Sequence, residues 1–93
     1  MEFLVQINVE LPHELAEREL SDLTQAEERR ARELRHAGTI QRIWRIPGRR
    51  ENVGVWSAPD ADGVHSAIAS LPMYRYLQVR VTALAEHPSE APR

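Results

Sequence analysis

The chain has 93 residues, of which 12 are basic and 14 acidic, with a formal net charge of −2 and no cysteine. This length suffices for one domain, and the lack of cysteine excludes disulfides, thiolate nucleophiles and cysteine-ligated metals. The two signs of charge are mixed along the chain, which argues against a dedicated surface for nucleic acid or anionic lipid. No apolar stretch is long enough to span a membrane and the start has no basic leader, so we expect a cytoplasmic protein.

The first part of the chain predicts a strand followed by a long helix. Residues 2–10 alternate, with Phe3, Val5, Ile7 and Val9 on one side, which is typical of a strand with one buried face. The polar segment that follows is rich in Glu, Arg, Ala and Leu, which favour helix. The segment runs to residues 35–39, where Gly38 supplies a C-terminal stop signal for the helix.

The second part predicts a hairpin, a short helix and a final strand. Val64, Ile68 and Leu71 recur at helical spacing, and Asp60 or Asp62 lies near the start of that helix. The predicted elements are strands at residues 39–47, 51–58 and 76–84, and a helix at residues 59–72.

This βαββαβ order predicts an α+β, ferredoxin-like fold with a four-stranded antiparallel sheet and two helices on one face. Residues 1–86 form the predicted single domain, and residues 87–93, which show no pattern, a loose C-terminal tail. The other face of the sheet carries apolar residues and has no cover. We therefore expect a homo-oligomer.

One charged residue interrupts the apolar stripe of the long helix. At about 100° per residue, the middle of the stripe falls on Glu27. A carboxylate there loses hydration, which costs several kcal/mol unless a partner or a cavity compensates. It is either half of a structural salt bridge, for instance to Arg45, or a functional acid or base. Arg45 and Asn52 are predicted on adjacent strands and could both face it. The stripe consists of Leu20, Leu23, Ala31 and Leu34.

The remaining candidates carry weaker signals. His65 lies at the edge of the second helix's apolar stripe, where a histidine is more often solvated or packed than functional. Trp44 and Trp56 are most simply core or interface residues. Tyr74 follows the second helix, and packing in a loop is slightly favoured over a substrate contact. The histidines show no metal-ligand spacing, so we expect no metal site.

Taken in order, several short motifs resemble the muconolactone Δ-isomerase family over nearly the whole chain. No single motif is decisive, but the ordered set is specific. It consists of Glu27, Gly38-Thr39, Trp44-Arg45-Ile46 with Gly48, Asn52, His65, Leu71-Pro72 and His87-Pro88-Ser89.

The resemblance implies an isomerase that shifts a proton within an unsaturated lactone, in the β-ketoadipate branch of aromatic catabolism. It implies the ferredoxin-like fold, ring-like oligomers such as a decamer, a cytoplasmic location, and neither metal nor organic cofactor. Such a reaction needs a base, a donor to the carbonyl oxygen and a cation for the substrate carboxylate. Glu27, Asn52 and Arg45 match these catalytic roles. The expected substrate-binding residues are Arg50, Trp44, His65 and Tyr74.

Three positions differ from the family pattern and affect the substrate more than the proton chemistry. Arg50 replaces a usual aromatic residue, Glu51 a small one and Arg75 a proline. All three add charge near the expected rim of the pocket. The alternatives are therefore a same-family enzyme for a related or chlorinated butenolide, or a non-catalytic ligand-binding oligomeric module. A nucleic-acid-binding sheet is disfavoured, because the first strand lacks aromatic residues flanked by basic ones.

Overall fold

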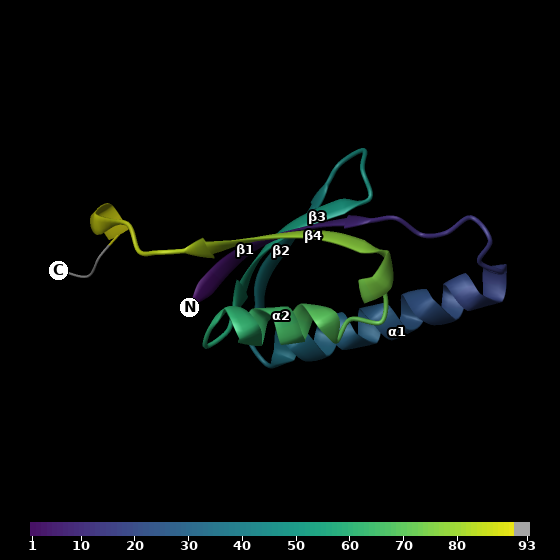
Figure 1. Ribbon diagram of the computed structural model, residues 1–93, viewed down its shortest axis with the longest axis horizontal. Coiled ribbons are helices and arrows are strands. Elements are labelled where there is room, and N and C mark those ends of the chain that lie inside the picture. The colour runs from purple at the N-terminus through teal and green to yellow at the C-terminus, as the bar shows by residue number, and fades with distance from the viewer. Residues whose placement is uncertain (91–93) are drawn as a thin grey trace.

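The computed structural model describes residues 1–90 and consists of one antiparallel sheet with both helices on the same side (Figure 1). The strands lie in the order β2-β3-β1-β4. This confirms the predicted βαββαβ order and the ferredoxin-like class. The elements are β1 (Glu2–Val9), α1 (Glu17–His36), β2 (Ile40–Ile46), β3 (Glu51–Ser57), α2 (Ala61–Ala69), the 3-10 helix η1 (Tyr74–Tyr76), β4 (Leu77–Leu84) and the 3-10 helix η2 (Pro88–Glu90).

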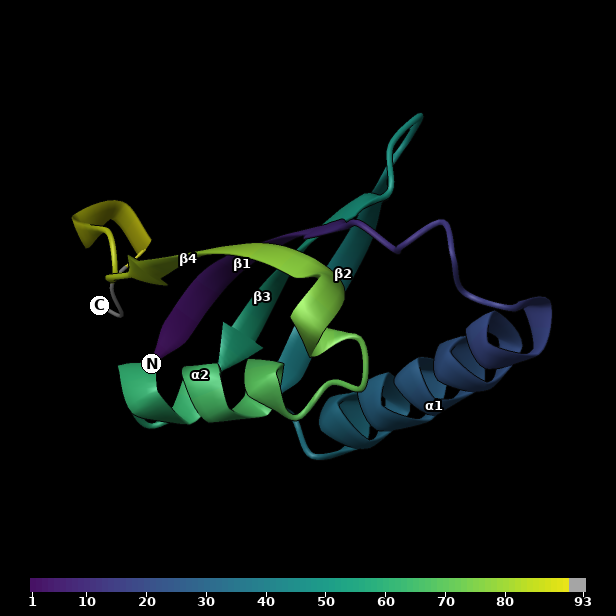
Figure 2. The same ribbon diagram turned by 45° about the vertical axis from the view of Figure 1, so that its right-hand side comes forward.

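The C-terminal segment projects from the body of the domain, beyond the end of β4 (Figure 1). It contains η2, which lies within the stretch expected to be a loose tail (87–93). Residues 91–93 of that predicted tail lie outside the described residues. On the helical side, α1 reaches beyond the end of α2 (Figure 2).

Local sequence signals fix the helix ends. Gly38 adopts a φ of 81°, and the next N–H, of Thr39, donates to the carbonyl of Leu34 at 2.9 Å, which closes α1. At the start of α2, the Asp60 carboxylate accepts a hydrogen bond from the Gly63 N–H at 2.8 Å. The first of the two candidate aspartates is therefore the cap.

The core lies between the sheet and the helices. In β1 and β3, Phe3 lies opposite Trp56 and Val5 opposite Gly54, and directly opposed residues share a face of the sheet. The alternation predicted for the first strand therefore directs its apolar side toward the helices. The buried cluster contains Phe3, Val5, Ile7, Leu34, Ile40, Trp56, Val64, Ile68 and Leu71.

An irregularity in β2 sets which residues of that strand face the helices. The register shifts between Ile40 and Arg42, next to Gly54 of β3. A Cβ atom on Gly54 would lie 2.6 Å from the Arg42 carbonyl oxygen, so only glycine permits this close approach. Beyond the shift, Ile43 pairs with Gly54 and Arg45 with Asn52, which places both on the helical side.

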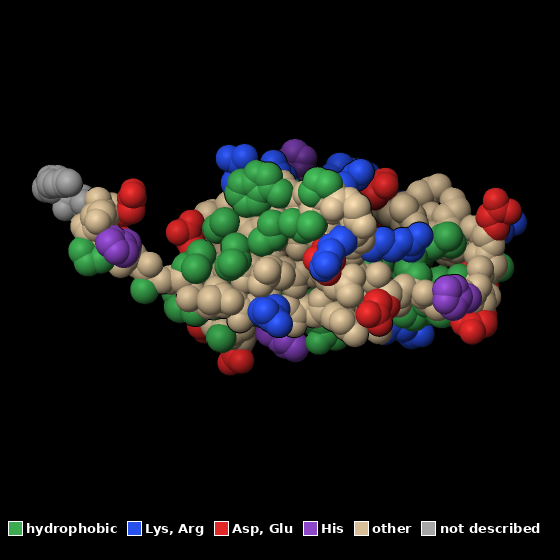
Figure 3. All heavy atoms as spheres, turned by 90° about the horizontal axis from the view of Figure 1, so that it is seen from above, with side chains coloured by type: hydrophobic (Ala, Val, Ile, Leu, Met, Phe, Trp, Pro, Cys, Tyr) green, Lys and Arg blue, Asp and Glu red, His purple; other side chains and the backbone are tan. Residues whose placement is uncertain are grey.

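The opposite face of the sheet is partly apolar and has no helix over it. By register it carries Leu4, Trp44, Val53 and Val55, and Trp44 is 44% exposed. Figure 3 shows hydrophobic side chains gathered over this face, with arginines around them.

Candidate active site

Glu27 lies in the middle of α1 with its side chain partly buried. Its Oε1 accepts a hydrogen bond from the N–H of Met73 at 2.9 Å, and Met73 is only 8% exposed. Met73 belongs to the turn between α2 and η1, so this bond joins the two helical segments. Within residues 1–90, the ion pairs are Arg30–Glu33 and Arg49–Glu51, and neither involves Glu27. A salt bridge from Glu27 to Arg45 is therefore not formed in the described chain.

The surroundings of Glu27 make its carboxyl a stronger base than an exposed glutamate. Burial raises its pKa above the ordinary value of 4.5, and the Met73 N–H lowers it by a smaller amount. The net effect is a raised pKa. One oxygen is held by a backbone donor, and no cation from residues 1–90 pairs with the group, so the carboxylate remains able to accept a proton.

Asn52 and Arg45 lie in one row across the sheet, on the side of the helices. Ile7 of β1, Asn52 of β3 and Arg45 of β2 are consecutive partners, and Ile7 is 5% exposed in the core. The Oδ1 of Asn52 is buried without a hydrogen-bond partner in the described chain, as is the indole Nε1 of Trp56 on the same side of β3. An unsatisfied buried group of this kind costs about 1–3 kcal/mol. A bound ligand would explain a buried amide oxygen that has no partner at this place in the row.

Two adjoining hollows open beside this row. The first, of about 520 Å³, lies under the β2–β3 hairpin, and the second, of about 860 Å³, lies against the segment that joins β1 to α1. Val9 and Arg50 line both. Within residues 1–90, Arg45 and Arg50 form no ion pair, whereas Arg49 pairs with Glu51 at 3.4 Å. The first hollow is lined by Val9, Ile43, Arg45, Arg49, Arg50, Glu51 and Asn52, and the second by residues that include Leu20 and Tyr76.

His65 and Tyr74 lie next to each other, but away from the two hollows beside Asn52. Their rings are 6.2 Å apart in an edge-to-face arrangement, at an interplanar angle of 86°. They line an apolar groove of about 440 Å³ between α2 and β4, together with Val79 and Val81. The polar residues of the β2–β3 row do not line this groove, and Glu27 lines neither this groove nor the two hollows beside the row.

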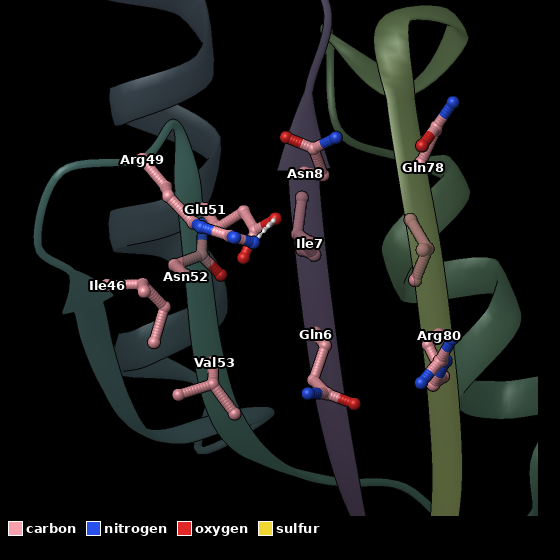
Figure 4. Close-up of a pocket in the computed structure, with 11 residues that line it drawn as sticks. Gln6, Ile7, Asn8, Ile46, Arg49, Glu51, Asn52, Val53, Gln78 and Arg80 are labelled. Atoms are coloured by element: carbon pink, nitrogen blue, oxygen red, sulfur yellow. Dashed lines mark hydrogen bonds and ion pairs between the residues drawn. The ribbon is translucent and has the colours of Figure 1, made fainter.

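Trp44 lies on the opposite face of the sheet from the Asn52 row. It pairs with Val53, and the guanidinium of Arg42 lies 4.8 Å from the centre of its ring. A polar hollow of about 520 Å³ opens on this same face, and Figure 4 shows it with the helices behind the strands. Polar residues around it include Gln6, Asn8, Arg49, Glu51, Gln78 and Arg80.

The structure thus brings Asn52, Arg45 and Arg50 together and separates Trp44, His65 and Tyr74 from them. Sequence reasoning missed the Met73 N–H, because a backbone donor leaves no side-chain signal. It also missed Val9 and Tyr76, which line the larger hollow. The sequence predicts Val9 only on the buried side of the first strand and Tyr76 only at the start of the last strand. No signal short of the tertiary arrangement could have placed them there.

Across residues 1–90, no group of three or more His, Asp or Glu side chains is arranged to hold a metal ion. In the same part of the chain, no helix combines the length and apolar character needed to cross a membrane.

Residues 1–90 match the family of muconolactone delta-isomerases. The chain is 33% identical to the muconolactone delta-isomerase of Cupriavidus pinatubonensis, over 96% of this chain and 97% of that protein. It is 30% identical to that of Acinetobacter baylyi, over 96% and 93%. A crystal structure of muconolactone isomerase superposes with a TM-score of 0.90 at 30% identity, covering all of this chain and 97% of the other.

The thermal stability of Glu27→Gln shows whether Glu27 is half of a buried ion pair or an unpaired base. Burial raises the folded-state pKa of Glu27, so the ionised form reduces stability above that pKa, and the penalty fades as the pH falls toward 4.5. At pH 7 we expect the variant to melt at or above the temperature of the parent, and the difference to shrink in acid. Thermal unfolding across pH measures this, with the exposed neighbour Glu28→Gln as control. A loss of about 3 kcal/mol or more would indicate a stranded arginine instead.

Proposed function

This chain belongs to the muconolactone delta-isomerase family, and on that premise we propose that it converts muconolactone to 3-oxoadipate enol-lactone. The family is one of isomerases. The conversion moves one proton within the unsaturated lactone, in aromatic catabolism, and we place it in the cytoplasm. The observation that carries the proposal is the partly buried Glu27, which has a raised pKa and no cationic partner among the described residues.

Glu27 acts as the base that takes and returns the proton. The proton leaves the ring carbon that bears the carboxymethyl arm and is delivered to the carbon next to the lactone carbonyl. The intermediate is a dienolate, so the base must face both carbons across one side of the ring. Oε1 is occupied by the Met73 N–H, while Oε2 makes no hydrogen bond within residues 1–90 and is available to the substrate. A raised pKa brings the carboxyl closer to the working pH, which favours transfer in both directions.

Asn52 stabilises the negative charge that develops during the proton transfer. Negative charge gathers on the lactone carbonyl oxygen in the dienolate, and an amide N–H aimed at that oxygen stabilises it. Asn52 is held in β3 between β1 and β2, which fixes the backbone that carries the amide. A fixed donor of this kind is typically worth roughly 3 kcal/mol in the transition state.

Arg45 and Arg50 supply the cation for the carboxylate of the substrate. Both line the hollow under the hairpin beside Asn52, and neither is used in an ion pair within residues 1–90. A guanidinium binds a carboxylate through two parallel hydrogen bonds, which fixes the orientation of the ring as well as its position. Trp44, His65 and Tyr74 remain proposed substrate contacts. In this arrangement, Trp44 reaches the substrate only if another subunit brings it there.

A homo-oligomer, and specifically a decamer, is the assembly we propose. The sheet face without helices carries Trp44 and other apolar side chains, and its burial would add to the small core of the chain. Sedimentation that gave a monomer at micromolar concentration would contradict this assembly.

A related or chlorinated butenolide is the second candidate substrate. The supporting observation is the charged rim, where Arg50 lines both hollows and Glu51 pairs with Arg49. A panel of butenolides, compared by kcat/KM, separates the two candidates. A non-catalytic ligand-binding module is disfavoured, because such a module has no use for an unpaired, partly buried carboxylate.

Removal of the base should abolish most of the activity. Glu27→Gln keeps the shape of the side chain and an acceptor for the Met73 N–H, but it cannot take a proton. We expect kcat with muconolactone to fall by two or more orders of magnitude, in an ultraviolet assay of the purified protein. Glu28→Gln, on the exposed side of the same helix, should retain parental activity. Normal turnover per folded molecule of Glu27→Gln would end the catalytic assignment.

Neutralising the cations should weaken substrate binding. We expect Arg45→Gln or Arg50→Gln to raise KM about tenfold or more, because a charge-assisted hydrogen bond contributes roughly 1.5–3 kcal/mol. The exposed Arg18→Gln on α1 serves as the matched control and should leave KM unchanged. If both pocket variants bind as well as the parent, the cation for the carboxylate lies elsewhere.

A further inference from the structure

A second contact joins α1 to the turn after α2, the turn whose Met73 N–H donates to Glu27. The Nε of Arg30 donates to the Oγ of Ser70 at 2.9 Å, the same separation as that of the Met73 N–H from Glu27. Glu27 and Arg30 are three residues apart on α1 and so lie on the same side of the helix. Ser70 and Met73 are also three residues apart, at the two ends of the turn that follows α2.

Ser70 is fixed from its own side as well. It caps the C-terminus of α2, directly after the last helical residue Ala69. Its hydroxyl donates to the carbonyl of Ala67 at 2.6 Å, while its Oγ accepts from Arg30. The guanidinium of Arg30 is steadied in turn by the carboxylate of Glu33 at 3.0 Å. The end of α2 is therefore held to α1 through a continuous set of hydrogen bonds.

The turn between Ser70 and Met73 is short and well ordered by its own contacts. Leu71 is 5% exposed, and its N–H donates to the Ile68 carbonyl at 3.1 Å. The N–H of Tyr74 then donates to the Leu71 carbonyl at 2.9 Å. With proline at position 72 the backbone has little freedom, so the position of Ser70 determines that of the Met73 N–H.

We infer that Arg30 and Ser70 are positioning residues for the base: they hold the Met73 N–H against Oε1 of Glu27 and so keep Oε2 directed at the substrate. This inference rests on the proposed function of Glu27. Neither residue needs to touch the substrate. A misplacement of about 1 Å in a reacting group can reduce the rate roughly a hundredfold, so a contact at this distance from the chemistry can affect turnover.

Other groups around Glu27 do not supply the same restraint. Within residues 1–90, none of the charged or titratable side chains on the elements near it forms a hydrogen bond or ion pair with its carboxylate. These side chains are Arg30 and Glu33 on α1, Arg45 on β2, and Tyr74, Arg75 and Tyr76 in η1. The Met73 N–H is thus the contact that fixes the rotamer of the carboxylate.

The test compares Ser70→Ala with Ser70→Thr and Ser66→Ala. Ser70→Ala removes the acceptor of the Arg30 bond, Ser70→Thr retains the hydroxyl, and Ser66→Ala makes the same deletion at an exposed position of α2. We expect Ser70→Ala to lower kcat about tenfold to a hundredfold with KM little changed. Ser70→Thr should recover most of that loss, and Ser66→Ala should behave as the parent. Arg30→Gln should repeat the effect of Ser70→Ala, with the exposed Arg29→Gln as its control.

The pH profile distinguishes positioning from a merely structural role. The Met73 N–H lowers the pKa of Glu27, so its loss should move the acid limb of kcat/KM to higher pH. Hydrogen exchange of residues 71–76 should become faster in Ser70→Ala, which reports the loosened turn without an activity measurement. An acid limb that stays in place or moves to lower pH, or unchanged exchange with parental kcat, would overturn the inference. If Glu27→Gln is itself fully active, the proposed function fails. The exchange data then report only whether Arg30 and Ser70 hold the turn in place.

Discussion

A carboxylate that faces the interior without a cation is the constraint on which the site depends. Glu27 occupies the one position where the apolar side of α1 should continue, and burial raises its pKa. The fold reduces the cost with a single backbone hydrogen bond from Met73. A full ion pair would stabilise the charge further but would remove its basicity. The turn after α2 therefore contributes in two ways. Its Leu71 is buried in the core, and its Met73 N–H donates to the base.

The sheet contributes the complementary polar groups through its register. Because Ile7, Asn52 and Arg45 are consecutive partners, an apolar row at the centre of the core becomes polar as it reaches β3 and β2. The irregularity in β2 is essential to this arrangement, since a shift by one residue would move Arg45 to the opposite face. Gly54 permits that irregularity by leaving space beside the Arg42 carbonyl. An amide and two arginines thus reach the same hollow as a consequence of strand pairing.

Much of the fold could be predicted from periodicity and from helix and turn signals. The alternation of Phe3, Val5 and Ile7 identified the buried face of β1, and Gly38 marked the end of α1, because both follow from local geometry. The site was only partly predictable. Glu27 stood out as a charge in an apolar stripe, and Asn52 as an amide within a strand, yet Trp44 proved to lie on the face away from the helices. The β2 irregularity and the Met73 N–H depend on backbone contacts between distant segments, which no side-chain pattern encodes.

The central claim, that Glu27 is an unpaired and partly buried base, is tested most directly by its pKa. Infrared titration of the carboxyl stretch, taken as the difference between the parent protein and Glu27→Gln, isolates this one group. We predict that Glu27 titrates above its ordinary value of 4.5, because desolvation outweighs the single hydrogen bond from Met73. A value at or below 4.5 would contradict the account, because it would show a carboxylate that is either solvated or neutralised by a cation.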